Sequence, residues 1–165
     1  MDRSILLYGS ETWQLRHKDV QKLSVFDNLC LRYIARVKWS DYVSNDEVYR
    51  RVFRNSQHTK PLSFIINLHR LRWLGHVLRM QPNRLPLRTI LANSAPQWKK
   101  PSGRQHMTWL QNMKTLALPL SKIGMHRLPG WNPHDHPLLW LRTLSEMATC
   151  RSQWRTCIRS IANTR

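Results

Sequence analysis

Apolar residues recur along this chain at spacings of three and four, the spacing of one face of an α-helix. The pattern predicts amphipathic helices over residues 18–38, 62–80 and 138–162. In the first helix the stripe that should face the core comprises Leu23, Phe26, Cys30, Tyr33 and Val37. In the last helix Arg151 interrupts an otherwise apolar stripe, so we expect a bend or reduced burial there.

Local signals predict shorter helices between these three. Ser44 and Glu47 have the spacing of a capping box, so a helix should follow to about Arg54. Weaker patterns predict helices over residues 87–93 and 108–118, with proline-containing loops around them. The chain has only 5 glycines, too few for the many tight turns of a β fold. We therefore expect an all-α fold: a small irregular helical bundle with a long C-terminal helix.

The segment 62–80 has two faces of different character. One stripe is mostly apolar and the other is basic; they comprise Phe64, Leu68, Leu71, Gly75 and Leu78, and His69, Arg72, His76 and Arg79, respectively. A glycine inside a helix costs up to about 1 kcal/mol relative to alanine, so we expect another helix or backbone to approach Gly75 closely. Trp73 lies beside the basic stripe, where its ring could stack on a base or pack in the core.

The overall charge of the chain indicates what kind of partner the basic stripe would bind. Lysine and arginine total 27 against 9 acidic residues, for a formal net charge of +18, and residues 48–134 contain no acid at all. A long block of one sign repels itself unless a polyanion neutralises it, and nucleic acid is the commonest such partner. A hydrophobic content of 41% with 8 tryptophans argues against a disordered basic tail.

These patterns nominate a set of phosphate-contacting side chains. The set is Arg70, Arg72, His76, Arg79, Lys99, Lys100 and Arg104, with Trp73 as a possible base-stacking residue. The alternative is that one of these arginines pairs inside the protein with Asp41, Asp46 or Glu47.

Catalytic and metal-binding patterns are mostly missing from the sequence. Metal-dependent phosphoryl transfer needs clustered carboxylates, and the one adjacent acidic pair, Asp46–Glu47, belongs to the capping box. His134, His136, Cys150 and Cys157 match zinc spacing poorly. We therefore expect no enzyme activity, no cofactor and no bound metal.

The sequence also contains no long apolar run and no signal-peptide core, and its 3 cysteines do not suggest a disulfide framework. These features predict an intracellular protein, nuclear or cytoplasmic, without a membrane or small-molecule partner.

An ordered string of motifs gives the sequence a resemblance. In order these are Leu7-Tyr-Gly-Ser-Glu-Thr-Trp13, Cys30-Leu-Arg32, Val43-Ser-Asn45, Leu71-Arg-Trp-Leu-Gly-His-Val-Leu-Arg-Met80, Arg84-Leu-Pro86, Gly103-Arg104 and Arg151-Ser-Gln-Trp-Arg155. Together they resemble the region that follows the polymerase core in non-LTR (LINE-like) retrotransposon proteins, close to the RTE group.

The resemblance implies a C-terminal fragment of an endonuclease–reverse transcriptase. Residues 1–80 would correspond to thumb-like helices and residues 81–165 to a basic post-thumb region, with the missing polymerase palm as a partner. The family's catalytic carboxylates have no counterpart here, because Asp-Asp occurs nowhere in the chain.

Two functional interpretations follow. In the first, the chain grips the backbone of a template–primer, be it RNA, DNA or hybrid, without an active site of its own. In the second, it is a basic helical scaffold from a decayed retroelement that binds acidic protein or RNA nonspecifically.

Overall fold

The computed structural model describes residues 3–53, 60–92, 103, 108–123 and 126–162. It is an all-α fold, as the sequence predicts, and its only strands among the described residues form a minimal hairpin of Lys122–Ile123 (β1) and His126–Arg127 (β2). The chain divides into two compact units, Met1–Ile66 (unit 1) and Asn67–Arg165 (unit 2). The boundary between the two units lies within helix α4 (Leu62–Leu78).

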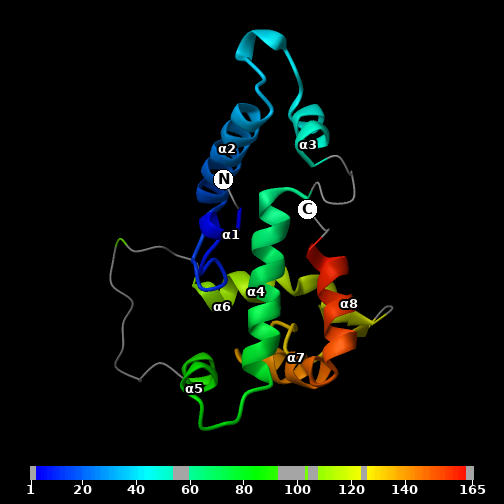
Figure 1. Cartoon of the computed structure of the whole chain (residues 1–165). Coiled ribbons are helices and arrows are strands. Elements are labelled where there is room, and N and C mark those ends of the chain that lie inside the picture. The colour runs from blue at the N-terminus through cyan, green and yellow to red at the C-terminus, as the bar shows by residue number, and fades with distance from the viewer. Residues whose placement is uncertain (1–2, 54–59, 93–102, 104–107, 124–125, 163–165) are drawn as a thin grey trace. The chain divides into compact units, whose positions relative to one another are not determined.

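Unit 1 is built on a helical hairpin. Its elements are α1 (Arg3–Leu6), α2 (His17–Ile34), the 3₁₀ turn η1 (Trp39–Asp41), α3 (Asn45–Phe53) and the first turns of α4 (Figure 1). A small apolar cluster of Leu7, Leu62 and Ile66 forms its buried centre. The predicted cap is present in part: Ser44 Oγ accepts from Glu47 N at 3.3 Å, while the Glu47 carboxylate pairs with Arg50 and Arg51.

The predicted core face of α2 is only partly right: Leu23 packs against the apolar cluster of unit 1 and Cys30 is half-buried. Phe26 and Tyr33 are exposed, and the buried positions are Asp27 and Leu31. Asp27 can be buried because Tyr49 on α3 donates a hydrogen bond from its hydroxyl to the carboxylate at 2.8 Å. The helix also ends at Ile34, four residues earlier than expected, and Arg36 follows in a left-handed conformation with φ 52°.

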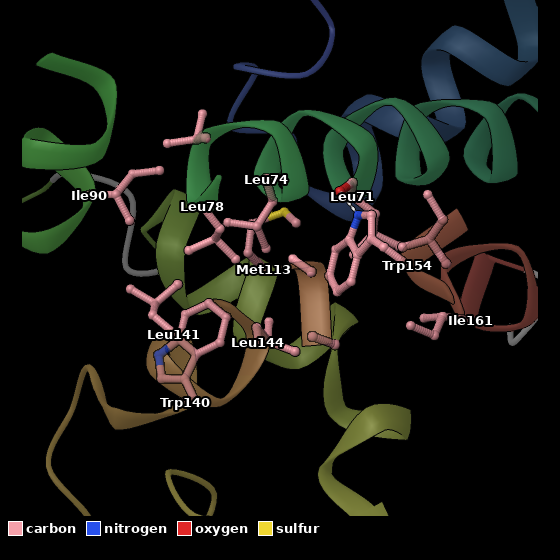
Figure 2. Close-up of a cluster of buried hydrophobic side chains, with 14 of the residues drawn as sticks. Leu71, Leu74, Leu78, Ile90, Met113, Trp140, Leu141, Leu144, Trp154 and Ile161 are labelled. Carbon is pink, nitrogen blue, oxygen red and sulfur yellow. Dashed lines mark hydrogen bonds between the residues drawn. The ribbon is translucent and has the colours of Figure 1, made fainter. Parts of the chain in front are cut away.

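Unit 2 has a larger core, which is built around buried tryptophans. Its helices are the remainder of α4, α5 (Leu85–Leu91), α6 (Trp109–Leu116), α7 (Leu139–Thr149) and α8 (Arg151–Ala162), with a 3₁₀ turn at Leu118–Ser121. Trp140 and Trp154 are both only 2% exposed and lie among leucine, isoleucine and methionine side chains of these helices (Figure 2). Thr108 begins α6 with a reciprocal capping box to Gln111.

The expected long C-terminal helix is two helices. Cys150 adopts an extended conformation with ψ 107°, which ends α7 and lets α8 begin at Arg151. The break leaves the carbonyl of Ala148 free of a helical partner, and Arg79 of α4 donates to it at 2.9 Å. Arg151, which interrupts the apolar pattern, is therefore the first residue of a new helix. The sequence predicts a bend or reduced burial at this position, and the structure has a break between two helices.

Candidate nucleic-acid interface

The basic stripe of α4 lies in unit 2 and faces α8. Arg72 and His76 are exposed and Arg79 is half-buried, while Leu71 and Leu74 on the opposite side are completely buried. The predicted separation of the two faces is therefore only partly present, since Leu68 of the apolar stripe lines the groove described below and Arg70 is buried. The apolar side fixes α4 in the core of unit 2 and leaves the basic side chains beside the groove described below.

Helix α8 supplies a second basic row that the sequence analysis did not nominate. Arg151, Arg155 and Arg159 recur at steps of four residues and are all exposed. With a rise of 1.5 Å per residue, the row spans about 12 Å along one side of the helix. Trp154, Ile158 and Ile161 lie on the buried side of α8 and hold the helix to the core. The signal was visible as Arg-x₃-Arg-x₃-Arg beside a heptad-like apolar pattern.

Gly75 sets the contact between the two helices. A Cβ added at this position would overlap the indole nitrogen of Trp154 and come within 2.6 Å of its Cδ1 and Cε2 atoms. The same indole nitrogen donates a hydrogen bond to the carbonyl of Leu71 at 3.2 Å (Figure 2). The predicted close approach at Gly75 is thus confirmed, and the approaching group is the ring of Trp154.

Between the two rows lies a groove of about 630 Å³. We call it the arginine groove; its lining residues are Leu68, Arg72, His76, Arg79, Arg151, Trp154, Arg155, Ile158 and Arg159. The lining therefore combines five arginines with one histidine, and no carboxylate of the described residues is part of it. A neighbouring hollow of about 480 Å³ shares His76 and Arg79 and adds Arg84, so the basic surface continues past the end of α4.

Electrostatic crowding is evident at Arg79. Burial lowers the pKa of this guanidinium, and the nearby positive charges of Arg151 and Arg155 lower it further. Its hydrogen bond to the Ala148 carbonyl partly offsets the loss of water. Like charges are thus held close together on a fixed scaffold, an arrangement that an anion would stabilise.

The other groove arginines have no competing protein partner among the described residues. There, Arg72, Arg151, Arg155 and Arg159 form no hydrogen bond or ion pair, and Glu47 is engaged by Arg50 and Arg51. Of the arginines nominated from the sequence, Arg72 therefore does not realise the alternative of internal pairing with Asp41, Asp46 or Glu47 among the described residues. The guanidinium groups of all four arginines are free to donate to phosphate oxygens in bidentate geometry.

The remaining nominated residues are distributed differently. Arg70 is only 3% exposed, so its side chain is not available to contact phosphate. Trp73 packs edge-to-face on Trp109, with ring centroids 5.3 Å apart, which favours the packing alternative over base stacking. Lys99, Lys100 and Arg104 lie outside the described residues.

Other chemistry is sparse in the described part of the chain. No group of three or more His, Cys, Asp or Glu side chains there has the arrangement of a metal site. Its three cysteines, Cys30, Cys150 and Cys157, are free thiols. Among the described helices, none has the length and apolar character needed to cross a membrane.

Comparison of the chain with family models, with curated proteins and with solved structures gives no match.

Proposed function

We propose that the chain binds nucleic acid through the phosphate backbone, which the arginine groove of unit 2 contacts from two sides. The observation that carries the proposal is the pair of facing basic rows, Arg72–His76–Arg79 and Arg151–Arg155–Arg159, between which the described part of the chain places no carboxylate. Because the two rows lie on separate helices, they match the spaced charges of an extended polyanion better than they match a single small anion.

Binding of this kind is insensitive to base sequence. Arginine contacts to phosphate fix the position of a nucleic acid but carry no base information. A row of about 12 Å covers roughly three to four phosphates of one strand at 3.4 Å per base pair. The groove would therefore engage a short stretch of backbone on any sequence.

The motif resemblance supports a polymerase context for this activity. The thumb of a reverse transcriptase holds the template–primer backbone, and the motif Leu71–Met80 that carries much of the resemblance supplies one wall of the groove. We propose that the chain helps a retroelement polymerase to hold its template–primer. The chain would catalyse no step itself, and the active site would lie elsewhere in the polymerase.

The salt dependence of duplex affinity tests this proposal. Each neutralised phosphate contributes about 0.9 to the slope of log affinity against log salt on duplex DNA. The variant Arg72→Ala/Arg155→Ala should therefore flatten the slope by about two units, equally on unrelated sequences. Titrations of a labelled duplex over a range of salt concentrations measure this directly.

A matched control removes the same charge elsewhere in unit 2. Arg88 and Arg142 are exposed and do not line the groove. Arg88→Ala/Arg142→Ala should leave most of the slope intact. Equal slopes for the two double variants would contradict a localised site, and an unchanged slope in Arg72→Ala/Arg155→Ala would contradict the proposed function altogether.

A further inference from the structure

A second surface, in unit 1, combines exposed rings with positive charge. The segment that joins α2 to α3 extends beyond the ends of both helices (Figure 1). At this end Trp39 is 88% exposed and Tyr42 is 94% exposed, although both are large apolar rings. Arg36 and Lys38 are exposed beside them. We call these four residues the aromatic tip.

The backbone of the aromatic tip is tied down at both sides. Arg32 at the end of α2 donates to the Val43 carbonyl at 2.7 Å and to the Asn45 side chain at 2.9 Å. The Asp41 carboxylate accepts from the Lys38 N–H at 2.8 Å. The two rings are therefore carried on a turn whose backbone these hydrogen bonds hold in place.

The same turn holds two non-glycine residues in the left-handed region. Arg36 has φ 52° and Tyr42 has φ 50°. For Arg36 this is the usual ending of a helix, since Val37 N donates across it to the Arg32 carbonyl at 3.0 Å. For Tyr42 the conformation is unfavourable and persists only because neighbouring contacts impose it. Tyr42 in particular keeps its ring in solvent from a backbone conformation that a glycine or asparagine would adopt more easily.

We propose that the aromatic tip binds single-stranded nucleic acid by stacking unpaired bases on Trp39 and Tyr42, while Arg36 and Lys38 contact the adjacent phosphates. Stacking on a ring tolerates any base, and interleaved cations add affinity for the backbone. The only carboxylate in the turn, Asp41, is already engaged by the Lys38 N–H, and the two exposed cations favour a polyanion over an apolar protein surface.

The aromatic tip is a separate site from the arginine groove, and the proposal for the tip does not depend on the proposed function of the groove. The groove lies in unit 2 and would recognise phosphate, whereas the tip lies in unit 1 and would recognise bases. Different probes therefore separate them: inorganic polyphosphate carries phosphates without bases, and a short oligothymidylate carries both without a duplex.

The experiment compares Trp39→Ala/Tyr42→Ala in the full chain with Trp39→Phe/Tyr42→Phe and with Tyr8→Ala, which removes an exposed ring elsewhere in unit 1. Each lost stacking contact should weaken oligothymidylate binding by about five- to 150-fold. Binding of polyphosphate should not change, the phenylalanine variant should retain most of the affinity, and Tyr8→Ala should behave as wild type.

Tryptophan fluorescence gives a readout that phosphate contacts do not produce. Oligothymidylate should quench the emission of the wild-type protein, and Trp39→Phe should abolish most of that quenching. Unchanged oligothymidylate affinity in Trp39→Ala/Tyr42→Ala would overturn the proposal and assign the tip to a protein partner. Equal losses on oligothymidylate and polyphosphate would also overturn it, because the rings would then act through fold or charge. Failure of the groove variants on duplex DNA would leave the outcome for the tip unaffected.

Discussion

Units 1 and 2 are stabilised by different kinds of contact. Among its described residues, unit 2 buries three tryptophans, Trp131, Trp140 and Trp154, with many aliphatic side chains, and its helices meet through close apolar packing. Unit 1 has a small apolar cluster and relies on polar ties such as Tyr49–Asp27, while Val25, Leu29, Tyr33, Trp39 and Tyr42 remain exposed. Unit 2 therefore carries its closely spaced charges on a well-packed core, whereas unit 1 leaves more apolar surface exposed.

The largest expected effect is in the core of unit 2. Trp154→Ala removes a buried ring and its hydrogen bond to Leu71, and should lower the free energy of unfolding by about 3–5 kcal/mol. It should also weaken duplex binding, because the ring holds α8 against α4. Chemical denaturation and duplex titration measure the two effects. Loss of stability with full duplex affinity would separate the groove from this contact.

A smaller effect is expected at Gly75. Alanine is the better helix former by about 1 kcal/mol, yet the new methyl group would overlap the Trp154 ring. We expect Gly75→Ala to destabilise the protein by about 1–3 kcal/mol net. Combining it with Trp154→Leu should cost less than the sum of the single changes, which a double-mutant cycle detects. A raised melting temperature in Gly75→Ala would contradict the close approach.

In unit 1 the corresponding test is Tyr49→Phe. Removing the hydroxyl takes a hydrogen bond from the buried Asp27 carboxylate and should cost about 1–3 kcal/mol. Amide hydrogen exchange should accelerate in α2 and α3, while duplex affinity stays that of the wild type. Faster exchange throughout α7 and α8 as well would show that the two units unfold together.

The smallest effect concerns charge in the groove. Arg155→Gln removes a like charge beside Arg79, whose pKa is lowered by burial and by Arg151 and Arg155. At low salt this change should be neutral or stabilising by a few tenths of a kcal/mol, and the gain should vanish at high salt. A destabilisation that persists at high salt would indicate a structural role for Arg155.

The sequence predicted local structure better than helix pairing. The helix over 62–80 and the cap at Ser44 follow from periodicity and capping chemistry, which act within a few residues. The break at Cys150 was not predicted as such, because the heptad-like pattern resumes after Arg151 and predicted at most a bend or reduced burial there. Asp27 was missed as a core residue because its burial depends on Tyr49, 22 residues away.

Only one of the two basic rows of the arginine groove could be predicted from the sequence, because the pairing of helices depends on residues far apart in the chain. Arg72, His76 and Arg79 share one helix face and could be nominated from their spacing. Arg155 and Arg159 belong to the site because Trp154 brings α8 against Gly75, a contact between positions 79 residues apart. Gly75 was the one local sign that another element would lie there, but it did not indicate which element.

The most direct test of the arginine groove measures the NMR signals of the arginine side chains themselves. In NMR spectra of the Nε–Hε groups, titration with a short duplex should shift Arg72, Arg151, Arg155 and Arg159 together and leave Arg88 and Arg142 in place. Inorganic polyphosphate should shift the same four signals, since the contacts are to phosphate. Uniform shifts across all exposed arginines, or shifts confined to arginines outside the groove, would contradict the account.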